Sequence, residues 1–193
     1  MKIDLSVVVT EEILNNLLKL SSNKKLPPTA QFGHIGTHFD IMDKTFHLDN
    51  TERTGRLFDV SNIQNRAIEI SDIDSTSIKE NDFVMFHTGR LKERGYGNPD
   101  YFIHHPELSD ELIAFLVDKK VSMIGIDSPG IRKAAEHAKA DQFCADHGIF
   151  VIENLANLDV VAKAAGTAEF VAHTYPVNYK GLSGLPCRVV AEI

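Results

Sequence analysis

The chain has 193 residues, 43% of them hydrophobic and 24% charged, an ordinary globular composition that suits a single domain over residues 1–193. Its formal net charge of −7, without a cluster of Lys or Arg, argues against nucleic acid as a partner. No apolar run approaches the roughly 20 residues of a membrane span and the N-terminus lacks the hydrophobic part of a secretory signal, so we expect a cytoplasmic protein without a membrane partner.

The N-terminal segment predicts a strand, a helix and a loop in succession. Residues 5–9 form a short β-branched run that is typical of a strand. Thr10 is placed to cap a helix over residues 11–20, and two early glutamates suit the positive end of its dipole. Residues 21–28 are polar and contain proline, so we expect a loop there.

The next segment, residues 33–40, reads Gly-His-Ile-Gly-Thr-His-Phe-Asp and concentrates metal-ligand side chains. In an extended segment His34, His38 and Asp40 share one face, whereas a helix would turn Asp40 roughly 200° away from His38. The spacing therefore predicts a strand. Four strand residues span roughly 13 Å, too far for two ligands of one ion, so we expect a bend at Gly36, which has no Cβ.

Two histidines and one carboxylate are a ligand set that leaves coordination positions open for water or substrate. Catalytic zinc sites use this arrangement, whereas structural sites are usually closed by four protein ligands. Zinc is the first expectation, although manganese accepts the same ligands. The alternative is that all three side chains are ordinary polar residues at the edge of a strand.

The rest of the chain predicts an α/β domain with helices outside a sheet, because helices and strands alternate. We expect strands at residues 66–70, 83–87, 121–126, 149–152, 169–177 and 187–193. We expect one helix that is capped by Ser109 and ends near Lys119 and Lys120, and another over residues 131–147 that is closed by Gly148. Loops are expected at residues 43–65 and 95–101. The first of these loops is expected to lie near the site. The two cysteines form no C-x-x-C pair, so we expect buried thiols and no disulfide framework.

Several further side chains follow predicted strands and are candidates for the site. Glu153 ends the strand at 149–152, where ligands of such sheets gather, so it is the next candidate for metal binding and catalysis; the alternative is a charged residue that leaves the strand for solvent. His87 and Thr88 are candidate substrate-binding residues, or purely structural ones. Asp127 precedes a Ser-Pro turn and is expected to cap its own backbone.

The motif His34-x-Gly36-Thr37-His38-x-Asp40 resembles the signature of the cyclase-like metal-dependent hydrolases, the group that contains bacterial kynurenine formamidase and isatin hydrolase. Weaker likenesses are found at residues 4–6, 88–89, 125–129 and 148–158. The resemblance implies a swivelling β/β/α fold with a mixed sheet and flanking helices, and a homodimer or homotetramer. It also implies one or two divalent ions per subunit and hydrolysis of a small amide, formamide or cyclic amide by a metal-activated water.

The chain departs from this family pattern at three positions. The formamidases carry a histidine four residues after the motif's aspartate and a proline two residues before that histidine, where this chain has Lys44 and Met42. They bind a second ion with a histidine twelve residues before the glutamate, where this chain has Asp141. A carboxylate there would favour harder ions such as manganese or magnesium. His137, one helical turn earlier, is an alternative ligand.

These departures leave the proton donor for the departing nitrogen open between Lys44, His47 and Glu153. Lysine serves only if its pKa falls by several units; otherwise it is a cationic anchor for a substrate carboxylate or an oxyanion, which is the interpretation we favour. The chain has no Trp, and its N-terminal segment lacks the substrate loop of the formamidases, so kynurenine-type recognition is not expected. The rival hypotheses are a metal-dependent small-molecule binding protein and a plain interaction domain.

Overall fold

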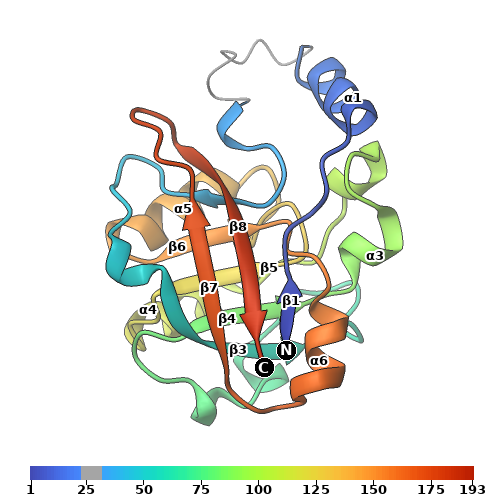
Figure 1. Cartoon of the computed structure of the whole chain (residues 1–193). Coiled ribbons are helices and arrows are strands. Elements are labelled where there is room, and N and C mark those ends of the chain that lie inside the picture. The colour runs from blue at the N-terminus through green and yellow to red at the C-terminus, as the bar shows by residue number, and fades with distance from the viewer. Residues whose placement is uncertain (23–31) are drawn as a thin grey trace.

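The computed structural model describes residues 1–22 and 32–193, and its main feature is one large sheet (Figure 1). The strands, in chain order, are β1 (Lys2–Asp4), β2 (His38–Asp40), β3 (Glu52–Asp59), β4 (Phe83–His87), β5 (Met123–Ile126), β6 (Phe150–Glu153), β7 (Phe170–Pro176) and β8 (Gly184–Glu192). The loop predicted at residues 21–28 lies outside the described residues, except that residues 21–22 belong to the preceding helix.

The strand order is β1-β8-β2-β6-β5-β4-β3-β7, and β7 also pairs with β8. All strands except β1 therefore form a closed, barrel-like ring. Neighbours from β3 to β6 run parallel, whereas β2, β7 and β8 pair antiparallel with their neighbours. The start of β8 pairs with β2 and its end with β1, so both described termini of the chain lie side by side.

The helices are α1 (Glu11–Ser22), α3 (Arg90–Arg94), α4 (Asp110–Asp118), α5 (His137–Asp146) and α6 (Leu158–Ala165), with 3-10 turns η1 (Leu48–Asn50), η2 (Ile70–Asp72), η3 (Ser75–Ser77) and η4 (Pro99–Phe102). Helices α4 and α5 pack on one face of the sheet, and α6 packs against the hydrophobic cluster on the other face (Figure 1). None of the helices in the described part of the chain is long and apolar enough to cross a membrane.

Alternating side chains of the central strands supply two hydrophobic cores. Phe83 and Met85 of β4 point into a cluster that also holds Phe39, whereas Val84 and Phe86 point into a second cluster under α4 and α5. Both faces of β4, β5 and β6 are thus covered, which explains why these strands read as continuous apolar runs. The predicted strands at 83–87, 121–126 and 149–152 are confirmed within a few residues.

The predicted helix ends are confirmed where capping signals exist. The Ile13 N–H donates to Thr10 Oγ1 over 3.2 Å, and the Leu112 N–H donates to Ser109 Oγ over 3.1 Å. Gly148 follows α5 with φ of +77°, a conformation that suits glycine. Helix α5 itself begins only at His137, so the prediction of helix over residues 131–136 was wrong.

Other predicted elements differ from the structure. The loop expected at residues 43–65 contains β3, whose first residues are polar and mostly exposed. The strand expected at residues 66–70 is only a single bridge from Ile68 to Leu108, followed by η2. The first strand lies at Lys2–Asp4 rather than at residues 5–9, and α6 was not predicted. The α/β class with a mixed sheet and flanking helices is confirmed.

Candidate metal centre

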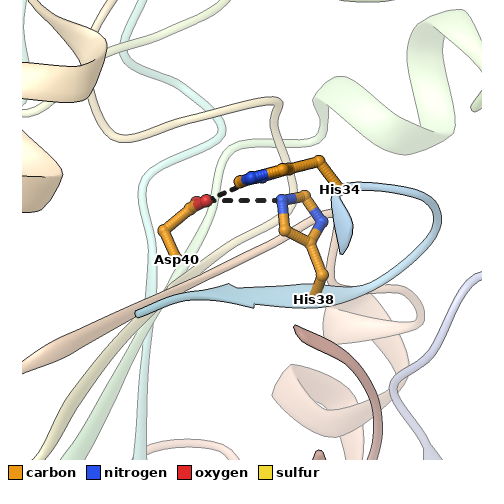
Figure 2. Close-up of side chains that lie close together, drawn as sticks. All are labelled: His34, His38 and Asp40. Carbon is orange, nitrogen blue, oxygen red and sulfur yellow. Dashed lines mark ion pairs between the residues drawn. The ribbon is translucent and has the colours of Figure 1, made fainter. Parts of the chain in front are cut away.

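Strand β2 presents two of the predicted ligands on one face, and a third reaches them from the preceding turn. His38 and Asp40 are buried on the same face of β2, while Phe39 between them lies in the core. The predicted bend is confirmed, because Gly36 has φ of +75°. His34 lies in a turn rather than in the strand, so the strand prediction was too long there; its Nδ1 nevertheless lies 2.9 Å from Asp40 Oδ1 (Figure 2).

Two glycines allow His34 to lie so close to the sheet. A Cβ on Gly184, at the start of β8, would lie 2.7 Å from Gly33 O and 2.7 Å from His34 Cε1. A Cβ on Gly33 would lie 2.5 Å from Gly184 O. The Ser183 hydroxyl adds a contact of 3.0 Å to His34 Nε2. The position of His34 therefore depends on a segment far along the sequence.

A second group of ligand side chains shares Asp40 with the first. Asp40, His137, Asp141 and Glu153 offer ligand atoms within 4.8 Å of one another. Glu153 ends β6, and His137 and Asp141 lie one turn apart on α5. His137 Nε2 lies 2.7 Å from Glu153 Oε1 and 3.0 Å from Asp141 Oδ2. The predicted candidates Glu153 and Asp141 are thus brought together with the motif, as is His137.

Four ligand atoms in this region are buried without a hydrogen-bond partner: His38 Nε2, Asp40 Oδ2, Asp141 Oδ1 and Glu153 Oε1. Glu153 Oε1 is close to His137, but not in hydrogen-bonding geometry. Buried polar atoms normally have a partner, because leaving them bare costs free energy. One or two cations bound by these groups would supply partners for these atoms.

Distances within the cluster test this fit. His38 Nε2 lies 3.7 Å from Asp40 Oδ1 and 3.5 Å from Glu153 Oε2. Two ligands held at roughly 2.1 Å in tetrahedral geometry lie about 3.4 Å apart. The imidazole and carboxylate donors therefore fit a divalent cation in both chemistry and spacing.

The metal-free cluster concentrates carboxylates in a buried space. Burial opposes ionisation of His38, but Asp40 and Glu153 outweigh it and raise the pKa of His38 to about 9. Burial, reinforced by the negative charges of Asp40 and Glu153, raises the pKa of Asp141 to about 7 although His137 opposes the shift. A bound cation would relieve this repulsion between carboxylates.

Lys44 and His47, two candidates for proton transfer, lie outside both groups. Lys44 Nζ lies 2.6 Å from Asp146 Oδ1 and 3.0 Å from Asp43 Oδ1, and its hydrogen bonds to these carboxylates, that to Asp146 first, raise its pKa. A proton-transfer lysine needs the opposite shift, so the structure does not favour this role. His47 is exposed and precedes η1.

His87 and Thr88 are buried, and the structure gives Thr88 a structural partner. The Thr88 N–H and hydroxyl donate to Asp127 Oδ1 over 2.7 and 2.6 Å, and the Gly89 N–H donates to Asp127 Oδ2 over 2.8 Å. The prediction that Asp127 caps its own backbone was wrong, because its carboxylate, at the end of β5, accepts hydrogen bonds from the turn after β4 instead. His87 Nδ1 lies 3.1 Å from Asp59 Oδ1. Substrate binding by His87 and Thr88 stays a prediction.

A cavity of about 980 Å³ adjoins the centre, lined by parts of residues 41–51 and 175–185. Ser183, which contacts His34, is part of its wall, and Lys44 lies on the opposite segment. Sequence reasoning missed this role for Ser183 and also missed Tyr96, whose hydroxyl accepts the Gly36 N–H over 2.6 Å. No local pattern marks these residues, since each contact joins distant segments.

A closed mixed sheet that holds two overlapping groups of His, Asp and Glu ligands, most of them buried, beside a cavity is an arrangement suited to a metal-dependent enzyme. A family model described as "Putative cyclase" matches residues 3–133, more than half of the sequence, and the chain belongs to this cyclase family. The predicted family resemblance is thereby confirmed.

Curated relatives agree with this assignment. Kynurenine formamidase of Bacillus thuringiensis subsp. konkukian is 30% identical over 175 residues, covering 82% of this chain and 76% of the relative. The enzyme of the same name from Bacillus cytotoxicus is 32% identical over 168 residues, covering 81% and 75%. These relatives bear out the prediction of an amidohydrolase that acts on a carbon–nitrogen bond other than a peptide bond.

Solved structures confirm the fold. A potential metal-dependent hydrolase with cyclase activity superimposes with a TM-score of 0.77 at 24% identity, covering 99% of this chain and 96% of that one. Isatin hydrolase A from Labrenzia aggregata superimposes with a TM-score of 0.70 at 21% identity, covering 83% and 73%. The two ligand groups of the candidate centre could hold a divalent metal ion.

Proposed function

We propose that this protein hydrolyses a small amide, formamide or cyclic amide at the centre built by β2, β6 and α5. The observation that carries the proposal is the convergence of four buried ligand atoms that have no hydrogen-bond partner. A divalent ion bound there supplies Lewis-acid polarisation of the substrate carbonyl and lowers the pKa of water toward neutrality. The relatives named kynurenine formamidase support this class of reaction.

The two ligand groups suit two ions that share Asp40. His34, His38 and Asp40 form a group rich in imidazole, for which we propose zinc, with manganese as the alternative. The second group has two carboxylates besides Asp40, with His137 as its imidazole, so it suits a harder ion such as manganese. The ligand sets thus support one or two ions per subunit.

Glu153 is the residue we assign to proton transfer. Of the three candidates, it is the one that belongs to the ligand groups, and its Oε1 is buried without a hydrogen bond. As water attacks the substrate carbonyl, Glu153 takes a proton from it and then gives that proton to the departing nitrogen. Breaking the carbon–nitrogen bond thus consumes one water and yields a carboxylic acid and an amine, which stay in one molecule when the amide is cyclic. Lys44, on the cavity wall, remains the proposed anchor for a substrate carboxylate.

The cavity beside His34 suits the body of the substrate. Its wall combines apolar side chains such as Phe46 and Leu182 with the ammonium groups of Lys44 and Lys180. This lining suits a substrate that has an apolar part, and a substrate carboxylate would have to compete with Asp43 and Asp146 for Lys44. Because Ser183 lines the cavity and contacts His34, a substrate bound in the cavity would have its scissile bond next to the ligand groups.

Oligomeric state, location and partners are part of the same proposal. We expect a homodimer or homotetramer in the cytoplasm, with a small molecule as substrate and neither nucleic acid nor membrane as partner. The net charge of −7 supports the exclusion of nucleic acid. Light scattering after size-exclusion chromatography measures the oligomeric state.

The decisive experiment uses protein stripped of metal and reloaded with zinc or manganese, tested on formylated aromatic amines, lactams and cyclic imides. The proposal predicts turnover of at least one compound and loss of bound metal and rate together in His38→Ala. His173→Ala is the control, because His173 lies on β7, pairs with Glu52 and Glu192, and belongs to neither ligand group. Full activity in chelator with no detectable metal contradicts the proposal. Tight binding of a small acid without any turnover supports the rival binding protein.

A further inference from the structure

The His38 imidazole is held by a backbone carbonyl that other residues fix in place. His38 Nδ1 lies 3.0 Å from Gly36 O, and the ring is buried. A carbonyl oxygen only accepts hydrogen bonds, so this contact requires the hydrogen on Nδ1. In the neutral ring Nε2 is then left with a bare lone pair, and it is the nitrogen that faces Asp40 and Glu153.

Asn154 acts on the same carbonyl. Its Nδ2 donates to Gly36 O over 2.9 Å, and its own backbone carbonyl accepts the Thr37 hydroxyl over 2.7 Å. Asn154 therefore ties the residues before His38 to the end of β6 through two hydrogen bonds. Because Asn154 directly follows Glu153, the same residue links the segments that carry two of the candidate ligands.

The orientation of the Asn154 amide is fixed from its other side. The Tyr101 hydroxyl donates to Asn154 Oδ1 over 2.8 Å, so the amide oxygen must face Tyr101 and the nitrogen must face Gly36. Tyr101 and Asn154 are both buried. Asn154 also has φ of +59°, a conformation that Asn adopts more readily than most residues.

We propose that Asn154 is a positioning residue that sets the tautomer of His38 and so presents Nε2 to the metal. The proposal rests on the proposed function for its purpose, but its geometry does not depend on the substrate. Groups that orient metal-bound histidines in this way typically change metal affinity by about 10–100-fold when they are removed. Tyr101 acts one step further away, through the amide.

The test compares Asn154→Gly with a matched control, Asn157→Gly. Asn157 also has a positive φ, of 56°, and its Nδ2 also donates to a backbone carbonyl, that of Asp4 over 2.7 Å, but it is exposed and away from the ligands. Glycine tolerates positive φ at both positions and adds no charge. Tyr101→Phe is a second variant that removes a single oxygen and stays informative if Asn154→Gly fails to fold.

Two measurements report on the proposal without using enzyme activity. Proton–nitrogen correlation spectra of metal-free protein with ¹⁵N-labelled histidine, recorded over a pH series that reaches the neutral ring, show which ring nitrogen carries hydrogen. The His38 signals are assigned as those missing from His38→Ala. Competition with a chromophoric chelator gives the zinc affinity of each variant.

We expect hydrogen on Nδ1 of His38 in the native chain and in Asn157→Gly. In Asn154→Gly we expect hydrogen shared between the two nitrogens and zinc affinity lowered by about 10–100-fold, with a smaller loss in Tyr101→Phe. Hydrogen on Nε2 in the native chain, or Asn154→Gly and Tyr101→Phe with native spectra and native zinc affinity, overturns the proposal. A native chain that shows the Nδ1 pattern but hydrolyses none of the test amides retains the positioning role and loses only the proposed function.

Discussion

Replacing Asp141 by Asn should stabilise the metal-free protein and weaken its metal binding. Asp141 is buried on α5, and its pKa rises from an ordinary value of 3.8 to about 7 because of burial and the charges of Asp40 and Glu153. Ionised Asp141 therefore destabilises the folded chain in the absence of metal. Asparagine has nearly the same shape, can still accept a hydrogen bond from His137, and carries no charge.

The size of the effect follows from that shift. At 1.36 kcal/mol per pKa unit, a rise from 3.8 to about 7 corresponds to about 4 kcal/mol. Because the folded-state pKa is raised, the penalty is absent below pH 3.8, grows as the pH rises, and is complete above pH 7. The variant should therefore match the native chain at pH 4 and melt about 10 °C higher at pH 8 in chelator.

Metal should narrow this difference. Zinc or manganese at a hundred times its dissociation constant stabilises the native chain by about 2.7 kcal/mol, and a chain that has lost one ligand gains less. The assay is thermal unfolding of both proteins between pH 4 and pH 8, with chelator and with metal. Asp146→Asn is the control, because Asp146 lies on the same helix but is exposed and paired with Lys44. A variant less stable than the native chain in chelator at pH 8, or a difference that does not change with pH, refutes the reasoning.

Three further perturbations test other parts of the structure. Phe39→Ala removes a fully buried ring 4.8 Å from that of Phe46 and should cost about 3–5 kcal/mol in urea unfolding, whereas exposed Phe143→Ala should cost little. Glu169→Gln should destabilise the protein at pH 7 but not near pH 2. Hydrogen bonds from Lys79 and Arg56 lower the pKa of Glu169 to about 2, so the stabilisation they give is present above pH 4.5 and is lost as the pH falls. Equal urea midpoints of the two proteins at pH 7 would contradict this. Lys44→Gln should retain the rate constant kcat if Glu153 transfers the proton, and a hundredfold loss of kcat would reassign that role to Lys44.

The orientation of side chains in β2 was predictable because one face of the strand packs into the hydrophobic core. The two-residue period of His38, Phe39 and Asp40 predicts which side chains point together, and the bend at Gly36 follows from ligand spacing. The place of His34 was not predictable in the same way. It depends on close packing of Gly33 against Gly184, a contact between distant segments that leaves no periodic signal.

Strand β3 shows how tertiary contacts override local composition. Its polar first half resembles a loop, yet it pairs with β4 on one edge and β7 on the other. Arg56 is buried in it because Asp82 and Glu169 accept its hydrogen bonds over 2.9 and 2.7 Å. Since both partners lie far away in sequence, the local pattern could not reveal that this charge is neutralised.

The second ligand group was predictable only in part. Glu153 followed from its place at the end of a buried strand, and Asp141 from the family resemblance. His137 joins them because α5 begins at that residue, which places it one turn before Asp141 and next to the end of β6. The alanine-rich run from 131 suggested an earlier start, because helix propensity does not mark where packing against the sheet begins.

The seam between β2 and β8 has a consequence for the biosynthesis of the centre. β2 has only three residues and is clamped between β6 and β8, with His38 opposite Glu153 on one side and Pro186 on the other. During translation, β2 leaves the ribosome long before residues 184–186 exist, so it has no partner on that edge for most of the elongation time. The strand that carries His38 and Asp40 therefore gains its second neighbour only after β8 has been synthesised.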